Sequence, residues 1–151
     1  MATYQEVDSY ITDTLEHKRL VAERLMEFIG KLVQRATTHD NSKLEEPERS
    51  IYASTVPRFK GVEYGTEEYK AITADLGPAW AHHQQNNSHH LPLDKMNLID
   101  LIEALCDWQA ANQQRDTGEF DIEKSARGAG EQLLQILKNT VEYMEGQDEL
   151  V

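Results

Sequence analysis

Residues 91–115, LPLDKMNLIDLIEALCDWQAANQQR, are the stretch that decides the fold class. After Pro92, the apolar residues Leu98, Leu101 and Leu105 recur at steps of three and four, and this spacing predicts an α-helix. Further apolar side chains cover most of its other faces. A helix that is apolar nearly all round usually lies at the centre of a helical bundle, so we expect this segment to form the core.

Helical periodicity recurs on both sides of this segment. The spacing predicts helices at about 5–36, 66–76 and 130–144, whereas strand-like alternation is nearly absent. We expect Gly30 to break the first helix and Gly77–Pro78 to interrupt the second. The sequence therefore predicts an all-α fold, a single helical bundle.

Length, hydropathy and cysteine content indicate how the chain is organised. The 151 residues favour one domain, which we expect over 1–146, followed by a flexible acidic tail over 147–151. No apolar run is long enough to span a membrane, and the N-terminal residues lack the pattern of a signal peptide. The single cysteine, Cys106, cannot form an intramolecular disulfide, which fits a reducing compartment. We expect a cytoplasmic protein without a membrane partner.

The charge balance restricts the partners. The chain has 27 acidic and 15 basic residues, a formal net charge of −12. Such a surface repels phosphate backbones, so a long nucleic acid is not an expected partner. A small phosphorylated ligand could still bind where metal ions or a few local cations reverse the field.

The segment 82–90, HHQQNNSHH, directly precedes the central helix. It holds four of the six histidines, namely His82, His83, His89 and His90. If the segment is helical, residues seven apart lie on one face; if it bends at Asn86–Asn87, both pairs converge on one cavity. We expect at least two of these imidazoles to bind a metal. The sequence does not indicate which histidine of each adjacent pair is the ligand. The alternative is a solvated, histidine-rich surface.

Three further positions carry metal-binding side chains. His39 and Asp40 are adjacent and offer an imidazole and a carboxylate to one divalent ion, although capping or packing would also explain them. Asp107 lies on the central helix opposite the apolar stripe, so it is either solvated or, because its neighbours are small, approached by another helix or a metal; a carboxylate buried there must be paired or must coordinate a metal. His17 is either a core residue or a ligand. It could share an ion with His39 only if the chain reverses near Gly30, because 22 helical residues span about 33 Å.

Cationic and amide side chains suggest how a phosphorylated substrate would bind. Lys43 follows the His39–Asp40 pair and could neutralise a phosphate or protonate a leaving oxygen; the alternative is a surface lysine paired with Glu46 or Glu48. Trp108 would stack on a base or belong to the core. The remaining candidates for substrate binding are Arg19, Arg35, Arg115 and Asn86.

The order of these residues resembles the H…HD…D motif of the HD-domain metal-dependent phosphohydrolases. This resemblance implies a helical bundle that binds one or two divalent metals through a core set of ligands: His17, His39, Asp40 and Asp107. The sequence HDNSK also resembles the HD-x-G-K of the HD-GYP cyclic-dinucleotide phosphodiesterases, in which further histidines bind additional metals. Here Ser42 replaces the glycine, and the GYP segment is missing.

A second resemblance covers about 17–140. The segments HDNSKLEEPE, HHQQNNSHH, DLIEALCDWQAA and LLQILKNT are similar to a short family found in phages and bacteria. If the chain is phage-encoded, this resemblance implies the host cytoplasm as its location. It implies little about the substrate.

Together, the residues and the resemblance predict a metal-dependent phosphohydrolase. Its cofactor would be one or two divalent ions (manganese, zinc, nickel, iron or magnesium), and a metal-activated water would attack a small phosphoester, most simply a nucleotide. Asp40 and Lys43 would be the catalytic residues. Two alternatives are an HD-fold di-iron oxygenase and a non-catalytic, metal-stabilised nucleotide-binding module. The sequence leaves open which metal and which phosphoester are used and whether the chain forms a homodimer.

Overall fold

The structure is a computed structural model that describes residues 2–115 and 118–146. Within these residues the chain forms six α-helices and four short 3₁₀ helices, labelled η1 to η4, and no β-strand. The predicted all-α class is confirmed. The chain divides into two compact units, residues 1–39 and 40–151.

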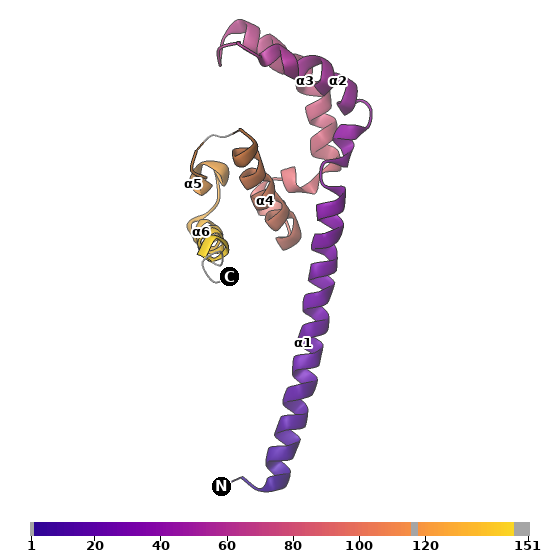
Figure 1. The fold of residues 1–151 in the computed structure, drawn as a ribbon, viewed down its shortest axis with the longest axis vertical. Coiled ribbons are helices and arrows are strands. Elements are labelled where there is room, and N and C mark those ends of the chain that lie inside the picture. The colour runs from indigo at the N-terminus through magenta and orange to yellow at the C-terminus, as the bar shows by residue number, and fades with distance from the viewer. Residues whose placement is uncertain (1, 116–117, 147–151) are drawn as a thin grey trace. The chain divides into compact units, whose positions relative to one another are not determined.

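The first unit is a single long helix, α1 (Tyr4–Thr38), drawn in indigo and purple in Figure 1. A capping box begins it: the Thr3 hydroxyl accepts from the Glu6 backbone N–H at 3.3 Å, and the Glu6 carboxylate accepts from the Thr3 N–H at 2.7 Å. The helix passes through Gly30 without interruption, so the predicted break there is wrong. One glycine costs a helix only about 1 kcal/mol relative to alanine, which well-capped flanking turns can offset.

The second unit begins with two helices, α2 and α3, that lie side by side in Figure 1. Its first elements are η1 (Asn41–Leu44), α2 (Glu48–Thr55), η2 (Val56–Phe59) and α3 (Glu67–Asn86). The predicted interruption at Gly77–Pro78 is wrong, because α3 continues through Pro78. Its buried side chains Ile72, Ala79 and His83 lie along one face, and their packing compensates for the backbone hydrogen bond that proline cannot donate.

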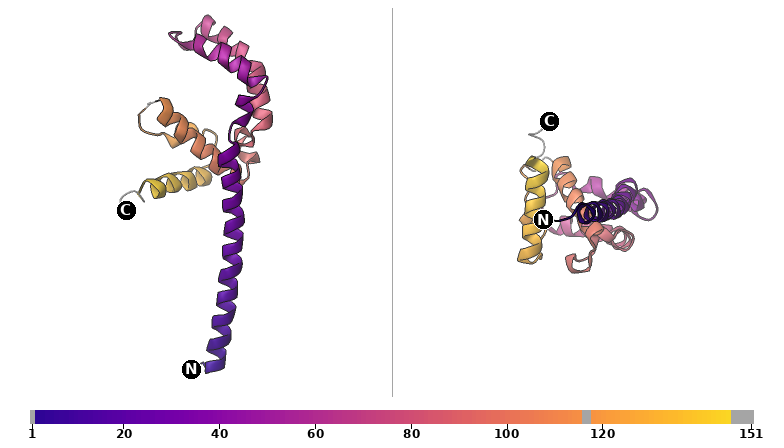
Figure 2. Two further views of the ribbon diagram at one scale, coloured as in Figure 1. Left: turned by 45° about the vertical axis from the view of Figure 1, so that its right-hand side comes forward. Right: turned by 90° about the horizontal axis from the view of Figure 1, so that it is seen from below.

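The remaining elements complete the second unit, and Figure 2 shows them from two further sides. They are η3 (Ser88–His90), η4 (Leu93–Lys95), α4 (Leu98–Arg115), α5 (Ile122–Ser125) and α6 (Glu131–Gly146). The central helix α4 begins at Leu98, later than Pro92 suggests, because the Asn97 side-chain oxygen accepts from the backbone N–H groups of Ile99 and Asp100 at 2.8 and 3.0 Å.

A hydrophobic core joins the C-terminal helices. Leu105 on α4, Ala126 after α5 and Leu137 on α6 are buried together, and Trp108 packs against them. Trp108 thus belongs to the core, which is one of the two roles that the sequence suggested for it. No helix in the described ranges is both long and apolar enough to cross a membrane.

The predicted acidic tail at 147–151 lies outside the described residues. The prediction of one domain over 1–146 stays a prediction.

Candidate metal centre

The histidine-rich segment bends at the end of α3. His82 and His83 lie in the last turns of that helix, which ends at Asn86. Asn87 then adopts an extended backbone, with φ −127° and ψ 101°, and η3 carries His89 and His90 back toward α3. The Nε2 atoms of His83 and His90 lie 2.9 Å apart as a result. Of the two conformations considered for this segment, the structure shows the bent one.

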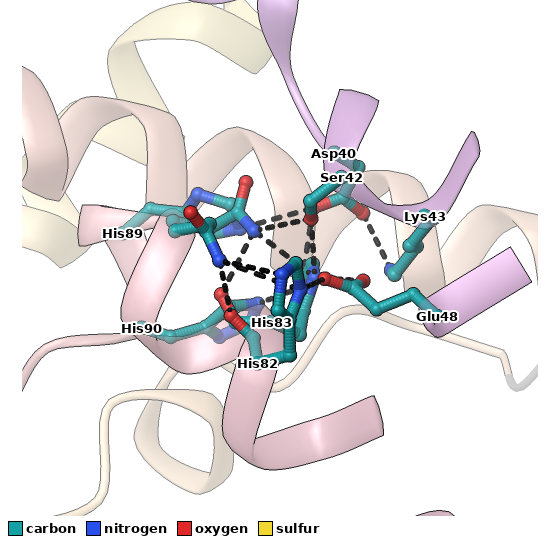
Figure 3. Close-up of polar contacts among 10 residues, drawn as sticks. Asp40, Ser42, Lys43, Glu48, His82, His83, His89 and His90 are labelled. Atoms are coloured by element: carbon teal, nitrogen blue, oxygen red, sulfur yellow. Dashed lines mark hydrogen bonds and ion pairs between the residues drawn. The ribbon is translucent and has the colours of Figure 1, made fainter. Parts of the chain in front are cut away.

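Asp40 approaches these imidazoles from η1. Its backbone has φ 56° and ψ 16°, a left-handed conformation that aspartate tolerates better than most residues and that is often found at functional sites. Its Oδ1 atom is buried and lies 3.3 Å from Nε2 of His83 and 3.5 Å from Nε2 of His89. Figure 3 shows the carboxylate facing the imidazoles from the opposite side of the cluster.

These side chains form a compact donor set with one ligand atom each, all within 4.8 Å of one another: Asp40, His83, His89 and His90. Two atoms that bind the same ion at about 2.1 Å are about 3.0 Å apart at a right angle and about 3.4 Å apart at a tetrahedral angle. The separations of 2.9, 3.3 and 3.5 Å agree with these values. Three imidazoles and one carboxylate therefore fit a single divalent transition metal ion.

Electrostatics keep one of these imidazoles neutral. Burial, followed by repulsion from His89 and His83, lowers the pKa of His90 to about 4, against the opposing effects of Asp107 and Asp40. At neutral pH His90 is therefore uncharged. A metal binds the lone pair of a neutral imidazole, so His90 needs to lose no proton before it binds.

A buried carboxylate lies behind His83. Glu48, the first residue of α2, is fully buried, and its two carboxylate oxygens lie 2.7 Å from Nδ1 of His82 and 2.9 Å from Nδ1 of His83. Burial raises the pKa of Glu48, but hydrogen bonds from His82, Ser42 and His83 outweigh it, so the pKa lies below its ordinary value. Glu48 is consequently ionised at neutral pH.

Polar contacts hold the end of α3 against η1. The Asn87 side-chain amide donates to the Ser42 hydroxyl at 2.7 Å and to the backbone carbonyl of His83 at 2.8 Å. Ser42 lies inside η1, where its hydroxyl contacts Nδ1 of His83 at 3.2 Å.

Two further acidic residues hold η3 on α4. Asp100 is buried and accepts from the Ser88 hydroxyl and, at 3.2 Å, from the Asn97 backbone N–H. Glu103, one turn further along α4, places a carboxylate oxygen 3.2 Å from Nδ1 of His89. Both contacts fix the position of η3 relative to the central helix.

Several predicted residues lie at or beside the cluster. Lys43 donates to the other carboxylate oxygen of Asp40 at 2.5 Å. It does not pair with Glu46 or Glu48, which was the alternative that the sequence suggested. Asp107 is half-buried, and one of its oxygens lies within 4.8 Å of one of Asp40. His39 is the last residue of the first unit and precedes Asp40 directly in the chain.

Other predicted residues have different surroundings. His82 is half-exposed and contacts Glu48, and within its pair His83 is the residue of the donor set. Asn86 donates to the backbone carbonyl of His82 at 2.8 Å. Arg115 is the last residue of α4, about 12 Å beyond Asp107 along the helix axis.

The structure does not bring His17 or Arg19 to His39. All three lie on or at the end of the uninterrupted helix α1, which places His17 about 33 Å from His39. The chain reversal that His17 would have needed is absent from α1. Arg19 forms ion pairs with Glu16 and Glu23 on the same helix, and Arg35 lies in its last turn.

Sequence inspection missed Glu48, Glu103 and Asp100 as parts of this centre. Each is a charged residue on a helix, and such residues usually face solvent. The one available signal was position: Glu48 follows Asp40 by eight residues, and Glu103 is one turn from Asp107. Only the packing of α2 and α4 against the histidine segment reveals their burial.

Comparison with known proteins identifies a family. The profile of a family described as "Family of unknown function (DUF5662)" matches residues 6–143, nearly the whole chain. Neither the curated proteins nor the solved structures include a significant match. The family description names neither a fold nor a reaction, so the resemblance to HD-domain phosphohydrolases stays a prediction. The chain belongs to the DUF5662 family.

Proposed function

We propose that this protein is a metal-dependent phosphohydrolase that acts on a small phosphoester. One observation carries the proposal: three imidazole nitrogens and one carboxylate oxygen lie within 4.8 Å of one another, and two of the four residues, His83 and His89, are buried. The resemblance of the sequence supplies the reaction class and adds His39 and Asp107 to the ligands. Of these, Asp107 lies beside Asp40.

The chain supplies two groups for proton transfer. Asp40 directs Oδ1 toward the imidazoles and Oδ2 toward Lys43, which is 43% exposed and therefore accessible to a substrate. In hydrolysis a water oxygen bonds to phosphorus, the ester P–O bond breaks, and the leaving oxygen takes up a proton. Asp40 would accept the proton that the water loses, and the Lys43 ammonium would donate one to the leaving oxygen.

A bound divalent ion would supply the remaining chemistry, by lowering the pKa of a water and by neutralising phosphoryl oxygens. Lys43 adds a positive charge at the exposed edge of the cluster, which offsets the net charge of −12 at this one position. A nucleotide is the proposed substrate class, by analogy with the HD-domain enzymes. The proposed location is the cytoplasm.

The first test is the metal content of the protein, purified without an affinity tag and measured by elemental mass spectrometry. We expect a stoichiometric divalent ion in the wild type and its loss in Asp40→Asn. Asp94→Asn is the matched control, because Asp94 is exposed and outside the donor set. Absence of metal from the wild type, even after reloading, would refute the proposal.

A second experiment tests the reaction. The metal-loaded protein is incubated with nucleoside monophosphates, cyclic dinucleotides and a generic aryl phosphate, and phosphate or product release is followed. We expect Lys43→Ala to retain the metal and to lower kcat by about 10²- to 10⁴-fold. Stoichiometric iron with oxygen consumption but no hydrolysis would favour the di-iron oxygenase. Tightly bound metal with neither activity would favour the non-catalytic module.

A further inference from the structure

Two of the candidate ligands share an arrangement that the donor set alone does not explain. His83 and His89 each direct Nε2 toward the same Asp40 oxygen, at 3.3 and 3.5 Å. On the opposite side of each ring, Nδ1 faces a carboxylate: Glu48 at 2.9 Å for His83 and Glu103 at 3.2 Å for His89. The two rings thus lie between an inner carboxylate and two separate outer ones.

We propose that Glu48 and Glu103 are positioning residues that hold His83 and His89 with the proton on Nδ1. The lone pairs of both Nε2 atoms then face Asp40. The positioning role rests on the proposed metal centre, whereas the positions of the two protons are a property of the chain itself. A neutral imidazole carries its proton on either nitrogen, and the neighbouring groups decide which.

The contacts around His83 determine this choice. The buried carboxylate of Glu48 lies 2.7 Å from Nδ1 of His82 and 2.9 Å from Nδ1 of His83, and a carboxylate group between two ring nitrogens acts as their acceptor, so Nδ1 of His83 donates to it. Asn87 also lies 3.0 Å from this nitrogen, but its two amide protons already go to Ser42 and to the His83 carbonyl. No amide proton is left to compete for Nδ1.

The inner side of His83 is consistent with this assignment. With the proton on Nδ1, its Nε2 atom is an acceptor that faces Nε2 of His90 at 2.9 Å and Oδ1 of Asp40. Either a proton on His90 or a cation can satisfy these inward-facing acceptors. Metal-bound histidines usually donate their second N–H to a carboxylate in this way, which fixes the ring and makes the ligand more basic.

Both outer carboxyl groups are largely buried. Glu48 is 0% exposed, and the side chain of Glu103 is only 8% exposed, so neither carboxylate gains much solvation. A buried carboxylate is stable only with donors around it. Glu48 has three, on His82, His83 and Ser42. Because its contact with a ligand is a 2.9 Å hydrogen bond, we expect Glu48 to have the larger effect.

The test measures the proton positions directly in the metal-free protein. Long-range ¹H–¹⁵N spectra at pH 7.5 distinguish the two tautomers of each histidine ring. We expect His83 and His89 to carry the proton on Nδ1 in the wild type. We expect Glu48→Met to shift only His83 and His82 toward the other tautomer, and Glu103→Met to shift only His89. Methionine matches the volume of glutamate but provides no strong acceptor, whereas glutamine retains one and should restore much of the wild-type pattern.

Glu46→Met is the matched control, since Glu46 is half-exposed and pairs with Arg49 on the protein surface. Its spectra should equal those of the wild type. A proton on Nε2 of His83 in the wild type, or unchanged tautomers in both methionine variants, would overturn the inference. The wild-type measurement decides the matter even if a variant fails to fold.

Metal titration separates this inference from the proposed function. We expect Glu48→Met to weaken binding of Zn²⁺ or Mn²⁺ about 10- to 100-fold and Glu46→Met to leave it unchanged. Equal affinity in Glu48→Met and the wild type would overturn the positioning role while the metal centre stands. A wild type that binds no metal but shows Nδ1 protons on both rings would refute the proposed function and retain the assigned tautomers.

Discussion

Nε2 of His83 and Nε2 of His90 lie 2.9 Å apart, although the first residue lies in the last turn of α3 and the second belongs to the following 3₁₀ helix. Two such nitrogens cannot both direct lone pairs at each other without a proton or a cation between them. This contact, together with the Asp40 carboxylate 3.3 Å from His83, defines the candidate metal centre. The following predictions test it and the fold around it.

Neighbouring histidines should differ sharply in their effect on metal binding. His83 is fully buried in the donor set, whereas His82 is half-exposed, lies outside that set and contacts the outer carboxylate of Glu48. We expect His83→Ala to weaken metal affinity by more than about 100-fold and His82→Ala by less than about 10-fold, because losing a ligand costs more than disturbing its support. Isothermal titration with Zn²⁺ measures both. Equal losses would contradict the assignment of His83 as the ligand of this pair.

His39 and Asp40 should both be needed for metal retention, as the adjacent imidazole and carboxylate in the sequence predict. We expect His39→Ala and Asp40→Ala each to lose bound metal in elemental analysis, because each substitution removes a ligand atom of the predicted site. His17→Ala, on the same helix as His39 but about 33 Å along it, should retain the metal. Full metal content in both of the first two variants would refute the site.

The stability of the metal-free protein should depend on pH through His90. Its folded-state pKa of about 4 lies below the ordinary value of 6.5, so between these values the unfolded chain binds the additional proton. The contribution of His90 to stability is therefore complete above about pH 6.5 and is lost as the pH falls toward 4. We expect the urea midpoint to fall over this interval, and to fall less steeply in His90→Gln. The same slope in both proteins would exclude His90 as a cause.

Asp100 should matter for stability more than for chemistry. It is buried and accepts from Ser88 on η3 and from the Asn97 backbone, so its loss leaves these donors without their acceptor. We expect Asp100→Ala to lower the free energy of unfolding by about 2–3 kcal/mol, measured by urea denaturation. The exposed Asp94, changed to alanine, should shift it by less than about 0.5 kcal/mol. A small effect of Asp100→Ala would show that η3 does not depend on this anchor.

Trp80 should report metal binding by fluorescence. Its ring centroid lies 5.3 Å from that of His90 and 5.9 Å from that of His83, whereas Trp108 packs in the core of the C-terminal helices. An open-shell ion such as Co²⁺ or Ni²⁺ quenches a nearby indole. We therefore expect strong quenching in Trp108→Phe, which retains Trp80, and weaker quenching in Trp80→Phe. The opposite order would place the ion away from His83 and His90.

The periodicity of the sequence was sufficient to locate the four long helices α1, α3, α4 and α6, because an apolar stripe is a local property of consecutive residues. The periodicity did not show whether a single glycine or proline interrupts a helix. Gly30 and Pro78 each suggested an interruption, and both lie inside continuous helices. The cost of one glycine or proline is a few kcal/mol at most, and the capping and packing of a whole helix can exceed it.

The candidate site, too, could be predicted from the sequence only in part. The clustering of imidazoles at 82–90 and the pair at His39–Asp40 could be seen in the sequence, since both are runs of adjacent residues. The choice of His83 over His82 could not. It depends on which side of α3 is buried against α2 and η1, and residues one apart on a helix point in different directions.

By itself, then, the sequence determined the helical class of the protein, its acidic surface and the residues able to bind a metal. Tertiary structure alone decided which of them converge and which carboxylates support them. The left-handed turn at Asp40 and the bend at Asn87 bring distant residues within a few ångströms of each other, and α1 keeps His17 away from His39. The physical reason is range: helix formation depends on neighbours within one or two turns, whereas a buried donor set depends on contacts between segments far apart in the chain.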